Sequence, residues 1–192
     1  MKVLSHQQQN NMKLILIGIQ GSGKSTQGNL LHKILDVSYL STGHIFRTIA
    51  KERTPLGRYI KETMNAGYLI PDDKTLEIVS EYLGRPTYNK GYILDGFPRT
   101  VTQAESFANG IDKVVYLKVS DKEALWRLSF REDESREDET LKAIHKRIRL
   151  FHEFTDPVIE YYKKKGQLVE IDGEQDIDTI HAEILKKIAK KK

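Results

Sequence analysis

The chain has 192 residues, of which 39% are hydrophobic and 30% are charged, and it has no cysteine and a formal net charge of +4. This composition is typical of a folded domain with one well-filled core, and it excludes a disordered chain, disulfides and thiolate metal sites. No apolar run approaches the roughly 20 residues of a membrane-spanning helix, so we expect a soluble, cytoplasmic protein without a membrane partner.

Both ends of the chain are polar. Residues 1–11 are rich in Gln and Asn and hold no apolar segment, which predicts a flexible N-terminal extension rather than a signal peptide. Much of the positive charge lies in residues 186–192, where five lysines surround Ile188 and Ala189. Cations at a helix end complement the helix dipole, so we interpret them as solvated charges and expect no nucleic-acid partner.

Five short apolar segments rich in branched residues are predicted to be buried parallel strands. They are Lys13–Ile17, 37–40, 92–94, 113–119 and 168–171. Helical patterns lie between them, and this alternation predicts an α/β fold with helices on both faces of a parallel sheet. Ligands of such folds bind at the carboxyl ends of the strands, so the loops after the first three strands are expected to meet at one edge.

The loop after the first strand carries a phosphate-binding motif. Residues 18–25 read GIQGSGKS, which fits the P-loop pattern G-x-x-x-x-G-K-[ST]. Its glycines let several backbone N–H groups point into one concavity, where the next helix, with Leu31 and Ile34 as apolar positions, presents its positive N-terminus. Lys24 adds a charge for the outer phosphates and Ser25 a hydroxyl for Mg2+. The motif therefore predicts nucleotide binding.

Two stretches interrupt the alternation of strands and helices. Residues 41–70 hold two helical patterns with no strand between them, broken at Thr54-Pro55 and ending at Gly67. Residues 127–139 are too polar to pack and are predicted to form an exposed loop between two helices. Segments of this kind, which leave the sheet and pass over the ends of its strands, often form lids over a binding site.

The third predicted strand ends in Asp95, within the stretch 91–100 that reads GYILDGFPRT. An aspartate at this position is where a P-loop enzyme holds the waters around Mg2+. Gly96 and Pro98 are predicted to form a turn from which Arg99 points back over the strand ends, where its planar fork gives bidentate phosphate contacts. The alternative, a surface arginine and a helix-capping aspartate, stays open on these residues alone.

Four of the arginines that follow in the second half of the chain support a phosphate site. Arg127 and Arg131 are four residues apart and share a helix face, Arg136 lies in the polar loop, and Arg147 lies in the next predicted helix. Exposed pairs with the nearby acidic side chains would contribute only about 0–1 kcal/mol each and do not explain arginine over lysine. Two nucleotides placed tail to tail carry several negative charges, which such arginines would neutralise. Trp126 is expected to pack beneath the loop, and the buried stripe of the following helix is predicted to be Leu141, Ile144, Ile148 and Phe151.

Together these motifs resemble those of the adenylate kinases, or more broadly of the nucleoside monophosphate kinases. The resemblance runs from about Met12 to the C-terminal helix, in that family's order. The matching segments are 18–27, 41–47 (STGHIFR), 67–72 (GYLIPD), 95–100 with Gln103, the arginines named above, Asp138, and Pro157 before Tyr161 and Tyr162. The sequence DGFPR at 95–99 is a far more specific signature than the P-loop alone.

The resemblance implies a reversible transfer of the γ-phosphoryl group of ATP to AMP, giving two ADP, with Mg2+ and without zinc. It implies a P-loop NTPase-type three-layer α/β fold with a five-stranded parallel sheet, a small helical NMP-binding insertion and a short lid. The single kinase domain would span 12–192, with its core at 12–40, 71–126 and 139–192, the insertion at 41–70 and the lid at 127–138. The chemistry requires only a monomer.

The resemblance also assigns roles to individual residues. ATP would be held by Gly21, Ser22, Gly23, Lys24, Ser25, Thr26, Arg127, Arg131 and Gly173. AMP would be held by Thr42, Arg47, Tyr68, Leu69, Ile70, Gly96, Arg99, Gln103, Arg136 and Arg147. Catalysis would fall to Lys24, Arg99, Arg127, Arg136 and Arg147, and Mg2+ to Ser25 and Asp95.

Three residues depart from the family's pattern. Gln20 stands in place of a P-loop proline, which we expect to loosen the turn without removing a phosphate donor. Ser25 replaces a common glycine and is expected to give Mg2+ a direct ligand. His44 replaces the aspartate that helps to organise metal-bound water, and we expect its imidazole to cap a helix or point to solvent.

The acceptor base is specified by a single position. In the family, threonine at the position of Thr42 goes with AMP and alanine with pyrimidine acceptors, so AMP is expected. Two alternatives stay open: a UMP or CMP kinase, and a catalytically impaired regulatory relative that binds nucleotides. Intact Lys24, Asp95 and phosphate-facing arginines weigh against the second alternative, because a binding module would not need all of them.

Overall fold

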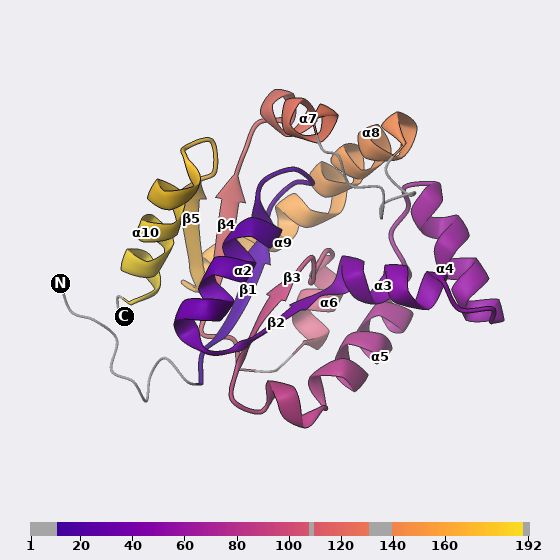
Figure 1. The fold of residues 1–192 in the computed structure, drawn as a ribbon, viewed down its shortest axis with the longest axis horizontal. Helices are drawn as coiled ribbons and strands as arrows, with labels where there is room; N and C mark the ends of the chain where they lie inside the picture. The colour runs from indigo at the N-terminus through magenta and orange to yellow at the C-terminus, as the bar shows by residue number, and fades with distance from the viewer. Residues whose placement is uncertain (1–10, 108–109, 131–139, 190–192) are drawn as a thin grey trace.

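The computed structural model describes residues 11–107, 110–130 and 140–189. Its five strands form one fully parallel sheet in the order β2-β3-β1-β4-β5 (Figure 1). The strands are β1 (Lys13–Ile17), β2 (Ser38–Ser41), β3 (Tyr92–Asp95), β4 (Lys113–Lys118) and β5 (Leu168–Asp172). The predicted α/β fold with a five-stranded parallel sheet is confirmed, and each strand begins and ends within one residue of its prediction.

Helices connect and cover the strands. In chain order they are α2 (Lys24–Leu35), α3 (Thr42–Ala50), α4 (Pro55–Asn65), α5 (Asp72–Leu83), α6 (Val101–Ser106), α7 (Asp121–Ser129), α8 (Leu141–Leu150), α9 (Asp156–Lys164) and α10 (Ile177–Ile188). A short 3-10 turn, η1 (Pro86–Tyr88), precedes β3, and a π-helical turn, η2 (Phe151–Thr155), joins α8 to α9. None of the helices in the described part of the chain is both long and apolar enough to cross a membrane.

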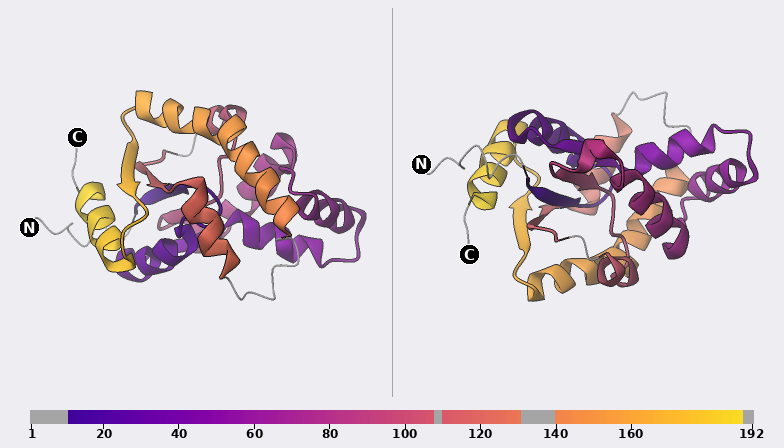
Figure 2. Two further views of the ribbon diagram at one scale, coloured as in Figure 1. Left: turned by 90° about the horizontal axis from the view of Figure 1, so that it is seen from above. Right: turned by 90° about the horizontal axis from the view of Figure 1, so that it is seen from below.

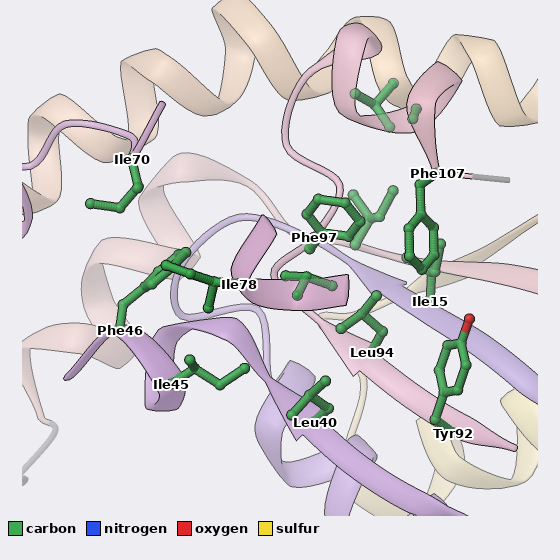
Figure 3. Close-up of a cluster of buried hydrophobic side chains, with 14 of the residues drawn as sticks. Ile15, Leu40, Ile45, Phe46, Ile70, Ile78, Tyr92, Leu94, Phe97 and Phe107 are labelled. Carbon is green, nitrogen blue, oxygen red and sulfur yellow. The ribbon is translucent and has the colours of Figure 1, made fainter. Parts of the chain in front are cut away.

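The sheet is buried on both faces, so the fold has three layers (Figure 2). In β1, Leu14 and Leu16 pack against apolar side chains of α2 and α10. The alternate residues, Ile15 and Ile17, join a second cluster with α5, α6 and α9. Figure 3 shows part of that second cluster, in which Phe97 stacks edge-on against the ring of Phe107 with centroids 5.0 Å apart. Successive residues of a strand point to opposite faces, which is why its apolar run is continuous.

The two helices predicted within residues 41–70 are present as α3 and α4, which pack against each other beside the edge strand β2 (Figure 1). Each begins at a side-chain cap. Ser41 Oγ accepts from the N–H of His44 at 3.4 Å, and Thr54 Oγ1 accepts from the N–H of Gly57 at 2.9 Å. Pro55 follows at the first helical position, where its missing N–H costs nothing.

One apolar position of a predicted helix is exposed, and two predictions of burial are wrong. Ile34 of α2 is 49% exposed, because the buried face of this helix runs through Gln27, Leu31 and Leu35 instead. Leu141 is 73% exposed at the start of α8, since the packed face of that helix begins with Ala143 and Ile144. Trp126, which was expected to pack, is 59% exposed, and the centroid of its ring lies 5.1 Å from that of Phe130.

Candidate active site

The P-loop lies between β1 and α2, as its motif predicts. Gly21 and Gly23 adopt φ values of 90° and 88°, a left-handed conformation that side chains other than glycine rarely accept. These two turns bring the loop back over the carboxyl end of β1 and onto the N-terminus of α2. Its backbone N–H groups and the helix dipole therefore face the same space, which suits an anion.

Lys24 is the first residue of α2, and its ammonium group lies over the P-loop. Nζ donates to the carbonyl of Gly18 at 2.7 Å and to that of Ile19 at 2.9 Å. These bonds hold the positive charge at the mouth of the loop. An ammonium group has three donor protons, so Lys24 can exchange carbonyl contacts for phosphate contacts when a nucleotide binds.

One cavity of about 610 Å³ connects the P-loop with the other predicted segments. Its volume is in the range of ordinary small-molecule sites. The predicted site residues that line it are Gly21, Ser22, Gly23, Lys24, Ser25, Thr26, Arg47, Tyr68, Leu69, Ile70, Asp95, Gly96, Arg99, Gln103, Arg127 and Arg147. The parallel strands thus bring together, at one edge, residues that are more than a hundred positions apart in the chain.

Among the described residues, two predicted site residues, Thr42 and Gly173, are not among those that line the cavity. Thr42 is 1% exposed, and its hydroxyl donates to the carbonyl of Asp95 at 3.1 Å, so it fixes the end of β3 from behind. Gly173 lies after β5, where its N–H donates to the carbonyl of Lys118 at 2.8 Å. Arg131 and Arg136, like Asp138, lie outside the described residues.

A hydrogen-bond network holds the loop that carries Arg99. The side chain of Gln103 is 1% exposed, and its Oε1 accepts from the Arg99 N–H at 2.7 Å while its Nε2 donates to Asp72 at 2.8 Å. The hydroxyl of Thr100 donates to the other oxygen of the same carboxylate at 2.8 Å. Arg99 itself donates from Nε to the carbonyl of Gly96 at 2.8 Å. The arginine is therefore preorganised at the end of β3, which favours the functional interpretation over a surface arginine.

Arg147 bridges three parts of the site. From α8 its Nη2 donates to the carbonyl of Met64, near the end of α4, at 2.9 Å. Its Nη1 donates to Oε1 of Gln20 in the P-loop at 3.4 Å. The side chain of Gln20, which departs from the family's proline, thus contacts one of the predicted catalytic arginines. Sequence reasoning treated this glutamine only as a change in the turn.

Arg127 and Trp126 of α7 form another part of the cavity wall. Arg127 donates from Nε to Glu123 one helical turn earlier at 2.7 Å, with about a quarter of its side chain exposed. Trp126, which is 59% exposed, also lines the cavity. Sequence reasoning missed this position, since an isolated aromatic residue beside a polar loop gives no signal of its direction.

Other lining residues were missed because their roles come from tertiary contacts. Gln27, which follows the P-loop motif, is 2% exposed, and its Nε2 donates to the carbonyl of Ile177 at 2.9 Å. His181 of α10 lies 3.2 Å from Oε1 of Gln27, and burial lowers the pKa of this histidine, which favours its neutral form at pH 7. Gln27 thereby ties α2 to the start of α10, where Gln175 and Ile177 also line the cavity. These contacts join segments about 150 residues apart.

The residues predicted to hold Mg2+ fit that ion. Ser25 and Asp95 both line the cavity. Asp95 is 7% exposed, and one of its oxygens accepts from the hydroxyl of Tyr39 at 2.6 Å, which orients the carboxylate. Mg2+ prefers hydroxyl and carboxylate oxygens, and at nucleotide sites it uses one or two protein ligands together with water and phosphate oxygens. Within the described residues, no group of three or more His, Cys, Asp or Glu side chains is arranged to hold a metal.

Comparison with known proteins gives one consistent result. A family model described as "Adenylate kinase" matches residues 16–167. A protein named adenylate kinase from Cyanothece sp. PCC 7425 is 38% identical over 180 residues, covering 90% of this chain and 92% of that protein. The adenylate kinase of Trichodesmium erythraeum IMS101 is 38% identical over 191 residues, covering 93% of this chain and 98% of that protein. The adenylate kinase of Bacillus velezensis FZB42 is 33% identical over 208 residues, covering 90% of this chain and 96% of that protein. With its P-loop, its DGFPR loop and its arginines around one cavity, the chain belongs to the adenylate kinase family.

Proposed function

We propose that this protein catalyses the reversible transfer of the γ-phosphoryl group of ATP to AMP, giving two ADP. The observation that carries this proposal is that one cavity is lined by the P-loop, by the loop of Arg99 and by residues of the helical excursion at 41–70. A site for one nucleotide would need only the P-loop. The names of the relatives support AMP as the acceptor over CMP or UMP.

ATP binds on the P-loop side of the cavity. The backbone N–H groups of residues 21–26 and the N-terminus of α2 hold its phosphates, and Lys24 reaches the outer ones. Arg127, and Arg131 outside the described residues, add positive charge on this side. The loop from Gly173 to the start of α10, tied to α2 by Gln27, forms the wall next to the adenine.

AMP binds between the excursion and the end of β3. Arg47 and Arg99 hold its phosphate, and the backbone of residues 68–70 and the amide of Gln103 contact its base and ribose. The network from Asp72 through Gln103 to Arg99 supports this assignment, because it orients the amide and the guanidinium together. Thr42 does not contact AMP in this proposal; its hydroxyl donates to the carbonyl of Asp95 and so holds the end of β3.

The chain divides by role in this proposal. Residues 12–192 form a single kinase domain after a short N-terminal extension, with its core at 12–40, 71–126 and 139–192. Residues 41–70 are the NMP-binding insertion and 127–138 the lid, which carries Arg136 to the phosphates. Because the transfer needs only one ATP site and one AMP site, we propose that the protein acts as a monomer, and we propose the cytoplasm as its location.

Catalysis consists of positioning and charge stabilisation. Phosphoryl transfer requires in-line alignment of the two nucleotides and neutralisation of charge on the transferred group. Lys24, Arg99 and Arg147 surround the junction between the two halves of the cavity with fixed positive charges. When bound, Mg2+ held near Ser25 and Asp95 neutralises phosphate charge and orients the oxygens of ATP. Closure over the site excludes water, which protects ATP from hydrolysis.

The proposal is tested with ADP and Mg2+ alone. Because the transfer is reversible, an adenylate kinase converts ADP into equal amounts of ATP and AMP, which chromatography separates. The Lys24→Met variant, which keeps the length of the side chain but loses its charge, is expected to slow this conversion by about a hundredfold or more. If the wild-type chain leaves ADP unchanged, or produces AMP and phosphate without ATP, the proposal is wrong.

A further inference from the structure

The chain between α8 and α9 makes a π-helical turn, η2, rather than continuing as an α-helix. At its end the N–H of Asp156 donates to the carbonyl of Phe151, five residues earlier. Turns of this kind are rare, and they are found most often at functional sites. The turn follows directly after the helix that carries Arg147, so its geometry decides which later side chains face the cavity.

The π turn places Thr155 on the face of Arg147. An α-helix advances about 100° per residue, so a side chain eight positions later would lie about 80° away round the helix. A π turn holds more residues, and each one advances less, which brings Thr155 back toward that face. Arg147, Phe151 and Thr155 all line the cavity. Thr155 is 5% exposed, whereas Glu153 on the same turn points to solvent.

The hydroxyl of Thr155 contacts Arg99 across 56 residues of sequence. Oγ1 donates to the main-chain carbonyl of Arg99 at 3.0 Å. The main-chain N–H of Arg99 donates to Oε1 of Gln103 at 2.7 Å. The main chain of Arg99 is therefore hydrogen-bonded through both its N–H and its carbonyl. Its Nε donates in turn to the carbonyl of Gly96. Together these bonds fix the main chain from which the side chain of Arg99 leaves and the direction of its guanidinium group.

We propose that Thr155, carried by the π turn η2, is a positioning residue for Arg99 in phosphoryl transfer. This inference rests on the proposed function and adds to it a residue that touches no substrate. Removal of the hydroxyl takes this donor away from the carbonyl of Arg99, so the peptide that follows Arg99 is less constrained. The guanidinium then shifts relative to the acceptor phosphate, and small shifts of catalytic groups are costly in rate.

The test compares Thr155→Val, which removes the hydroxyl, with Thr155→Ser, which keeps it. Thr155→Ala is the second hydroxyl-free variant, for use if valine prevents folding. Thr48→Val is the matched control, because the hydroxyl of Thr48 also donates to a main-chain carbonyl at 3.0 Å, that of His44, on the surface of α3. For each variant we would measure kcat, the KM for ATP, the melting temperature, and exchange of the Arg99 Nε proton by NMR.

In the hydroxyl-free variants, kcat should fall about tenfold or more with little change in the KM for ATP. Exchange of the Arg99 Nε proton should become faster, while T155S and T48V should resemble the wild type. A purely structural role would lower the melting temperature alone. A kcat within about twofold of wild type, or an unchanged exchange rate, would overturn the inference. An inactive wild type would instead overturn the proposed function, and the exchange rate would then decide the role of Thr155.

Discussion

Arg99 is held by hydrogen bonds at both its main chain and its side chain. Its N–H, its carbonyl and its Nε are each hydrogen-bonded to a different residue. The bonds of the N–H and the carbonyl hold the main chain of Arg99, and the bond from Nε orients its guanidinium group. From the DGFPR motif we predicted that Arg99 points back over the strand ends. Its bond to the carbonyl of Gly96 defines the direction of the side chain.

We predict that Arg99→Ala lowers kcat by about a thousandfold or more, by analogy with arginines that stabilise transferred phosphoryl groups. The variant should fold, because Gln103 and Thr155 contact the main chain of residue 99, which alanine retains. Turnover and the circular dichroism spectrum check the two parts of this prediction. Retention of more than about a tenth of the wild-type turnover would exclude a catalytic role.

Sequence reasoning found the residues whose roles come from local motifs. The glycines of the P-loop and the arginine of DGFPR are defined by their own loops, so their neighbours in sequence reveal them. Gln27 ends the matching P-loop segment, but its contact with Ile177 and that of Thr155 with Arg99 join segments far apart in the chain, which no local pattern reveals. Gln20 was seen as a missing proline, since only the fold brings Arg147 beside it.

At the scale of helices and strands, the spacing of apolar residues predicted where the elements lie better than it predicted which of their residues are buried. The strands were found because a parallel sheet covered on both sides needs continuous apolar runs. Leu141 matched the helical stripe of α8, yet it lies in the first turn, beyond the packed cluster of Ile144 and Ile148. The π turn η2 has no sequence signature in this chain, although it decides that Thr155 faces the cavity.

His152 of η2 links α7 to α9, and this link should depend on pH. Its ring nitrogens lie 2.9 Å from Asp156 and 2.8 Å from Asp121, and hydrogen bonds to these two carboxylates raise the pKa of His152 above its ordinary value. Because the pKa is higher in the folded state, the imidazolium stabilises the fold fully below the unfolded pKa of about 6.5. That stabilisation is lost as the pH rises through the folded pKa.

We therefore predict that His152→Gln lowers the free energy of unfolding more at about pH 5.5 than at about pH 9. The imidazole is half exposed, so solvent screening keeps the difference small. Urea denaturation of both proteins at the two pH values measures it. An equal loss at both pH values would show that the imidazolium contributes nothing to the link.

At the scale of the whole molecule, the sheet order explains how the P-loop and the loop of Arg99 come to line one cavity. With β1 at its centre and β3 beside it, the P-loop and the Arg99 loop leave neighbouring strands at the same edge. The excursion α3–α4 follows the next strand, β2, and α8 reaches it through the bond from Arg147 to Met64. The whole arrangement follows from strand order, which sequence patterns alone do not specify.

The central claim is direct transfer between two nucleotides in this cavity, with AMP as the acceptor. It is tested most directly by initial rates with Mg-ATP and, in turn, AMP, CMP, UMP or GMP, with ADP and free phosphate measured together. We predict rapid formation of two ADP with AMP, little turnover with the other acceptors, and almost no free phosphate. ATP consumption that yields phosphate at the same rate with and without AMP, and no AMP-dependent ADP, would contradict the claim.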